Sequence, residues 1–248
     1  MSVRLAIIAE PDLGEMAGLE GEFEWGTAIM VAPAASETEL AELGPDFLVA
    51  LGNASVPDGR GPDLRWLARP APQRVAAATI APGGEGLHGH ALLPVRDELF
   101  ALPPTPDPAS LLVVSRDADR RGALVGKVQK HGLPAAGAES LTREGLAGTA
   151  IVAFLTEPGD STMPASAPAV LAARRLLIAP PTRLSFGLLA GTDHLSAPGD
   201  DHVLAYALMA LVSPRSFDAV TVLGRVTAEY HRASSVYGRL VSELVYLA

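Results

Sequence analysis

Short, almost wholly apolar runs recur along this sequence, and they limit its fold more than any other feature. In the second half these runs are "SLLVVS" at 110–115, "GTAIVAFL" at 148–155 and "RLLIAP" at 175–180. A continuous apolar run of this length is typical of a strand buried on both faces of a parallel sheet. Helical tracts separate the runs, so the second half is predicted to be a parallel sheet covered by helices.

The first half repeats the alternation in a shorter form. Ser36 is predicted to cap a helix that has Glu39 three residues on and ends at Gly44. The stretch "DLRWLARP" at 63–70 is predicted to be a brief helix. The expected strands are "VRLAIIAE" at 3–10, "TAIMVA" at 27–32, "DFLVALG" at 46–52 and "QRVAAATIAP" at 73–82.

Four helices are expected in the second half. The stretch 116–132 has apolar residues at helical spacing and ends at Gly132, and a short helix is expected around 169–173. Asp200 or Asp201 is predicted to cap the helix that follows, and Ser216 is predicted to cap a long final helical tract.

The fold class that these segments predict is α/β, with two Rossmann-like lobes of parallel sheet flanked by helices. The segment "LPPTPDPAS" holds four prolines, a composition that favours an extended connector. The predicted organisation is therefore a reduced N-terminal lobe at 1–102, a linker at 103–109 and a second lobe at 110–248. One continuous α/β domain is the alternative.

Composition excludes several classes of function. The net charge of −9 makes nucleic acid a poor partner, because the chain repels phosphate backbones. The sequence contains no cysteine, so disulfides, thiolate nucleophiles and cysteine-bound zinc are excluded. No apolar stretch approaches the ~20 residues that a membrane-spanning helix needs. A cytoplasmic protein without a bound metal or resident cofactor is expected.

Three groups of residues suggest a known kind of binding site, but each lacks the spacing or the neighbouring structure that such a site needs. The G-x-G-x-x-G at Gly84–Gly89 is followed by Pro94, which interrupts the helix that a dinucleotide site requires. The D-x-D at Asp117–Asp119 fits helix-starting acids better than a metal site. Imidazoles and carboxylates at His88, His90 and 193–202 lack a recognised ligand spacing.

A cluster of arginines is the more informative feature. Arg116, Arg120 and Arg121 flank the end of one expected strand and the start of the following helix. Ligands of open α/β sheets bind beyond the carboxyl ends of the strands, where helix amides and guanidinium groups suit a diphosphate. An anion site is predicted here, with a solvated helix face as the alternative.

Four segments of the second half resemble, in order, the end of group 1 glycosyltransferases of the GT-B fold, and in particular the spore-maturation-type branch. These segments are "AVLAARRLLIAP", "SFGLLAG", "DDHVLAYALMALVSP" and "HRASSVYGRLVSEL". The resemblance implies transfer of a sugar from a nucleotide-sugar donor, with the three arginines neutralising the diphosphate. It also implies that backbone amides at 185–191 approach the donor. The donor-site residues so implied are Arg116, Arg120, Arg121, Glu157, Ser161, Ser185, Phe186 and Gly187.

The chain departs from that family at the two positions where it has paired acids. In this sequence the two positions are Ala169 and Ser161. Glu157 and Asp160 lie in the preceding loop, and they replace the paired acids only if that loop aligns with the family in a different register. Arg174 stands where the family has a glycine. Two functions are therefore open: an active glycosyltransferase, or an inactive GT-B-like scaffold that binds a second copy or another protein. An α/β domain that binds no nucleotide is a third alternative.

Overall fold

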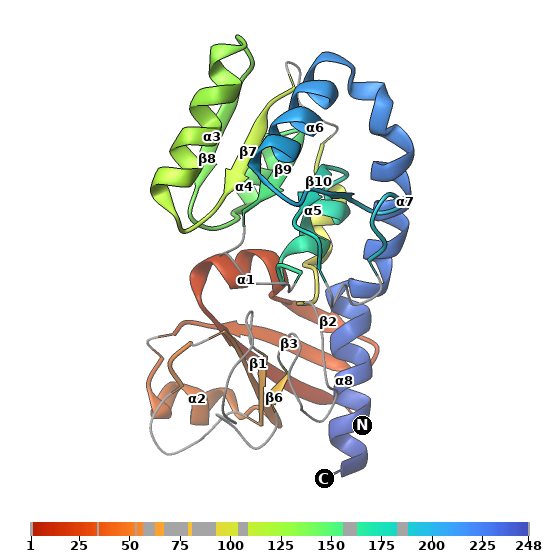
Figure 1. Ribbon diagram of the computed structural model, residues 1–248. Coiled ribbons are helices and arrows are strands. Elements are labelled where there is room, and N and C mark those ends of the chain that lie inside the picture. The colour runs from red at the N-terminus through yellow and green to blue at the C-terminus, as the bar shows by residue number, and fades with distance from the viewer. Residues whose placement is uncertain are drawn as a thin grey trace. The chain divides into compact units, whose positions relative to one another are not determined.

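The computed structural model describes residues 2–33, 35–52, 54–56, 63–66, 79–80, 93–103, 109–155, 163–182 and 188–247. The chain forms two compact α/β units. Unit 1 comprises Met1–Asp97 together with Tyr230–Ala248, and unit 2 comprises Glu98–Glu229 (Figure 1). These units differ from the predicted ranges mainly at the C-terminus, where the last helix groups with the N-terminal elements.

Unit 1 is built on one sheet in the order β2-β3-β1-β4-β5-β6, in which only β2 is antiparallel to its neighbour. Its strands are β1 Val3–Ala9, β2 Gly21–Phe23, β3 Gly26–Val31, β4 Phe47–Leu51, β5 Leu64–Trp66 and β6 Thr79–Ile80. The helix predicted at 63–70 is wrong at Leu64–Trp66. There the backbone pairs with β4 and β6, and this tertiary pairing overrides local helix preference.

The short helices of unit 1 are α1, Pro11–Ala17, and α2, Glu37–Leu43. The start and the end predicted for α2 are confirmed. The Ser36 side chain accepts from the Glu39 amide at 3.2 Å, and the Glu39 carboxylate accepts from the Ser36 amide at 2.6 Å. Gly44 ends the helix in the left-handed conformation at φ 55°, where a residue without Cβ is least strained.

The last helix, α8 at Ala233–Leu247, belongs to unit 1. Tyr237 is fully buried, and its hydroxyl donates to the Ala17 carbonyl at 2.9 Å. A Cβ at Gly238 would lie 3.0 Å from the indole ring of Trp25, so glycine lets the helix approach that ring closely. The end of the chain is therefore fastened to elements formed by its beginning.

Unit 2 is built on an entirely parallel sheet in the order β11-β10-β9-β7-β8. The strands are β7 Leu111–Val114, β8 Ala135–Ala138, β9 Ile151–Phe154, β10 Leu176–Ala179 and β11 Leu195–Ser196. All residues of β7, β9 and β10 are buried, which confirms the three apolar runs as two-sided core strands. Burying each large aliphatic side chain contributes about 1.5–3 kcal/mol.

Helices cover this second sheet, and α3 packs against α6 while α5 packs against α7. The helices of unit 2 are α3 Ala118–Lys130, α4 Arg143–Ala147, α5 Ala167–Ala172, α6 Asp200–Val212 and α7 Asp218–Ala228. Three 3-10 turns lie at η1 Asp97–Ala101, η2 Pro214–Phe217 and η3 Glu229–His231. The predicted long final helix is thus interrupted at η3.

Two predicted helix caps are wrong. The N-cap of α6 is Gly199, and neither Asp200 nor Asp201 caps this helix, because both carboxylates instead meet cations on α3. Ser216 lies inside η2, and the N-cap of α7 is Phe217, without a side-chain cap.

No single helix in the part of the chain that the structure describes is long and apolar enough to cross a membrane; only a bent pair, 200–212 with 215–231, reaches the required length and composition together.

Candidate functional site

The carboxyl edge of the second sheet is the place where a ligand site is expected. Taken in chain order, its strands lie in the spatial order second, first, third, fourth, fifth, so the connections reverse direction between β7 and β9. Sheets of this order bind ligands at that reversal, beyond the carboxyl ends of the two strands. The loop after β7 begins at Ser115, and the loop after β9 begins at Leu155.

The loop after β7 is arranged to start helix α3. The Ser115 hydroxyl accepts from the Asp117 amide at 3.2 Å, and the Asp117 carboxylate accepts from the Arg120 amide at 2.9 Å. Asp117 is therefore the N-cap of α3, and this is the simpler explanation of the D-x-D motif. Among the described residues, no group of three histidines or acids gathers to hold a metal ion.

The three predicted arginines lie at this edge in different environments. The Arg116 side chain is exposed, and no hydrogen bond or ion pair joins it to another described residue. The Arg121 guanidinium donates to the Ser115 carbonyl, and its aliphatic stem lies over Gly137, where a Cβ would come within 2.8 Å of it. Arg121 thus fastens the loop to the neighbouring strand β8, whereas Arg116 presents a charge outward.

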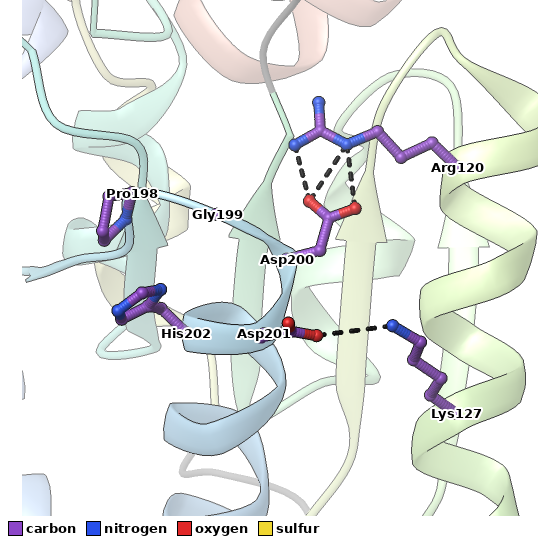
Figure 2. A pocket seen from close by; sticks show the side chains of 7 residues that line it. All are labelled: Arg120, Lys127, Pro198, Gly199, Asp200, Asp201 and His202. Atoms are coloured by element: carbon purple, nitrogen blue, oxygen red, sulfur yellow. Dashed lines mark hydrogen bonds and ion pairs between the residues drawn. The ribbon is translucent and has the colours of Figure 1, made fainter.

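Arg120 forms a bidentate ion pair with Asp200 of α6. Its Nε lies 3.0 and 3.1 Å from the two carboxylate oxygens, and its Nη2 lies 2.5 Å from one of them. Figure 2 shows the guanidinium reaching from α3 across the carboxyl ends of the strands to the first residue of α6. A second, looser pair joins Lys127 to Asp201 at 3.5 Å.

An open cavity of about 620 Å³ lies between α3 and the start of α6. A volume of this size is within the range of small-molecule sites. The residues that line it, shown as sticks in Figure 2, are Arg120, Lys127, Pro198, Gly199, Asp200, Asp201 and His202. Of these residues, only Arg120 is predicted from sequence as a donor-site residue. Asp200 and Asp201 are predicted there as alternative helix caps, and they belong, with His202, to the stretch 193–202 that lacks a recognised metal-ligand spacing.

The other predicted donor-site residues lie outside the described residues. They are Glu157, Ser161, Ser185, Phe186 and Gly187. The described end of the predicted amide loop is a tight turn held by Asp193, whose carboxylate accepts from the Leu189 amide at 2.8 Å and the Thr227 hydroxyl at 2.9 Å. His194 beside it is buried, and burial lowers its pKa against the opposing effect of Asp193.

Ala169 and Arg174, which depart from the glycosyltransferase pattern, lie in different environments at the two ends of one segment. Ala169 is 2% exposed in α5, all six residues of which are buried. Arg174 follows the end of that helix with φ 55°, a left-handed conformation usual for glycine, and its side chain is exposed. The backbone therefore keeps a glycine-like turn at 174, whereas the environment at 169 is closed to a carboxylate.

No protein-family model and no curated protein matches the chain. Among solved structures, the fold is similar to the glycosyltransferase SnogD from Streptomyces nogalater, at 13% identity over 100% of this chain and 99% of that chain, with a TM-score of 0.45. It is also similar to AviGT4, a glycosyltransferase involved in avilamycin A biosynthesis, at 13% identity over 99% of each chain, with a TM-score of 0.44.

Proposed function

We propose that this chain binds a nucleoside diphosphate at the carboxyl edge of the second sheet and transfers the sugar of a nucleotide-sugar donor to an acceptor. One observation carries the proposal: the exposed Arg116 is the second residue after β7, at the strand reversal and directly before the N-cap of α3. A helix amino end and an arginine together favour a phosphate group.

To catalyse this transfer, the carboxyl edge of the second sheet must stabilise the leaving group. In glycosyl transfer the bond between the anomeric carbon and the phosphate oxygen breaks while the acceptor oxygen bonds to that carbon. The departing diphosphate carries the negative charge, and the acceptor proton passes to a base. Fixed cations aimed at such a developing charge are among the largest contributions to catalysis. Arg116 supplies such a cation without a metal ion.

The closed environment of Ala169 bears on how the nucleotide is held. A carboxylate there would accept hydrogen bonds from ribose hydroxyls in the family that the sequence resembles, and alanine cannot accept them. We therefore expect nucleotide affinity in this chain to depend on the phosphate contacts more than on the ribose.

The test is a thermal-shift panel with UDP, GDP, ADP, TDP and CMP, confirmed by calorimetry. A ligand at 100 times its dissociation constant adds about 2.7 kcal/mol to the stability of the folded state. We expect one diphosphate to stabilise the chain, and Arg116→Gln to weaken its binding about tenfold, the effect of losing a charge-assisted hydrogen bond.

The matched control is Arg215→Gln, which removes an exposed arginine in η2, beyond the opposite end of α6. We expect this variant to bind the nucleotide as tightly as the unchanged chain. Release of the nucleoside diphosphate from a stabilising donor would then measure turnover. Silence across the panel would contradict the proposal and favour the inactive scaffold.

A further inference from the structure

The Arg120–Asp200 pair is more closely bonded and more shielded from water than an ordinary surface ion pair. Both side chains are 31% exposed, so the pair is partly shielded from water yet open to a ligand. Three contacts of 2.5 to 3.1 Å engage both carboxylate oxygens. Asp200 thus occupies Arg120 with the bidentate contact that a phosphate group would otherwise make.

The position of Asp200 is equally specific. It is the first residue of a 13-residue helix, where a carboxylate can bond backbone amides, yet no side-chain cap is formed. The carboxylate turns instead to Arg120 of α3, beyond the carboxyl ends of the strands (Figure 2). A diphosphate that reaches the Arg120 guanidinium must therefore compete with the Asp200 carboxylate for it.

We propose that Asp200 sets the affinity of this edge for diphosphate by competing for Arg120, so that the leaving nucleotide is released when the carboxylate takes the guanidinium back. This inference rests on the proposed function, because the competing ligand is the nucleoside diphosphate. It makes Asp200 a residue that weakens product binding. Removing its carboxylate should therefore raise the affinity for diphosphate, whereas losing an ordinary structural contact would lower that affinity.

The experiment compares Asp200→Asn with Asp218→Asn by calorimetry, using UDP, GDP, ADP and inorganic pyrophosphate. Both variants remove one negative charge from the first turn of a helix in unit 2. We expect D200N to bind the preferred diphosphate about tenfold more tightly, the effect of one charge-assisted interaction. D218N should change affinity less than about threefold, because Asp218 is exposed at the start of α7 and does not line the cavity.

Two further measurements separate competition from altered structure. The double variant Arg120→Gln with D200N should lose the tightening, because the gain requires the released guanidinium. In turnover with a donor, D200N should lower kcat and strengthen product inhibition while KM for the donor does not rise. A merely structural role for Asp200 predicts weaker binding and a higher KM.

Every outcome decides between the two proposals. If the unchanged chain binds a diphosphate and D200N binds it equally or more weakly, the role of Asp200 is wrong and the proposed function stands. If only D200N binds, Asp200 blocks the site, and nucleotide use by the unchanged chain is wrong. If neither protein binds any of the four ligands, both proposals fail.

Discussion

The two units have the same strand order but opposite charges where their first strands end. Without the antiparallel β2, the sheet of unit 1 runs β3-β1-β4-β5-β6, and the sheet of unit 2 runs β8-β7-β9-β10-β11. In unit 1 the residue after β1 is Glu10, and a Cβ added at Gly52 after β4 would lie 2.7 Å from its carboxylate. In unit 2 the corresponding reversal carries Arg116. The strand order fixes where a ligand can approach, and the loop residue fixes which charge it meets.

Each unit also has a half-buried arginine whose guanidinium holds a loop in place. Arg65 of unit 1 donates to the carbonyls of Gly52 and Ala54 at 2.9 and 3.1 Å, so its guanidinium ties the loop after β4. Burial lowers the pKa of Arg65, and Glu10 opposes that shift. Arg121 has the same kind of structural role in unit 2. At the strand reversal, however, unit 2 has the exposed Arg116 where unit 1 has Glu10, so we expect an anion to bind at the reversal of unit 2.

The largest expected effect contrasts a buried with an exposed helix position. Ala169→Glu places a carboxylate in α5, where every residue is buried, and we expect it to lower the free energy of unfolding by about 3 kcal/mol or more. Ala41→Glu places the same group on the exposed face of α2 in unit 1 and should change stability by no more than about 0.5 kcal/mol. Urea unfolding of both variants measures the difference.

The same two variants test whether position 169 can hold the acid that the glycosyltransferase pattern has there. Equal stability of the two variants would mean that position 169 has room for a carboxylate, and the closed environment inferred for it would be wrong. In that case Ala169→Glu should be added to the nucleotide panel, because a carboxylate there could bind ribose.

A medium effect is expected from a histidine of unit 1. Burial, with a smaller contribution from Arg239, lowers the pKa of His231 to about 4. The unfolded chain takes up this proton near pH 6.5, so the folded state loses stability as pH falls from about 6.5 to 4. Between pH 7 and pH 5 this one group should lower the free energy of unfolding by about 2 kcal/mol.

The measurement is urea unfolding at both pH values for the unchanged chain and for His231→Gln. The variant is expected to be less sensitive to acid by that amount, whatever its stability at pH 7. His194 of unit 2 has a pKa lowered by burial in the same direction, so His194→Gln is the comparison that assigns the acid sensitivity to one unit. An unchanged pH dependence in His231→Gln would show that folding does not lower the pKa of this imidazole.

Local patterns predicted the parts of the fold that local forces decide. The apolar runs that became β1, β7 and β9 were predictable, because strands buried on both faces need apolar side chains at every position. Strand β8 was not predicted, because its sequence "AAGA" is small rather than apolar and glycine is needed there for the stem of Arg121. Short β5 is likewise decided by its neighbours.

The candidate site was predictable only in part, for the same reason. Arg116, Arg120 and Arg121 follow a strand, so their place at the carboxyl edge could be inferred from sequence. The partner of Arg120 lies 80 positions away, and no local pattern indicates an ion pair over that separation. Asp200 looked like a helix cap because aspartate before a helix usually is one. The packing of α3 against α6 decided its actual role.

The smallest expected effect compares two helix ends with the same backbone angle. Gly44 after α2 and Arg174 after α5 both have φ 55°. At 174 the arginine amide donates to the Leu171 carbonyl at 2.9 Å, and the next amide donates to the Val170 carbonyl at 3.1 Å, as in a helix end closed by glycine. A left-handed conformation costs a side-chain-bearing residue roughly 1–2 kcal/mol, and the greater freedom of unfolded glycine offsets about 0.4–1 kcal/mol of this.

Arg174→Gly should therefore stabilise unit 2 by about 0.5–1 kcal/mol, and Gly44→Ala should destabilise unit 1 by a similar amount. The Gly44→Ala variant introduces no steric clash, because a Cβ at Gly44 would have its nearest neighbour at 3.7 Å. Opposite signs in urea unfolding would show that both ends have the same backbone strain. Loss of stability in Arg174→Gly would instead mean that the arginine side chain itself stabilises this turn, which would give a physical reason for its presence where the glycosyltransferase pattern has glycine.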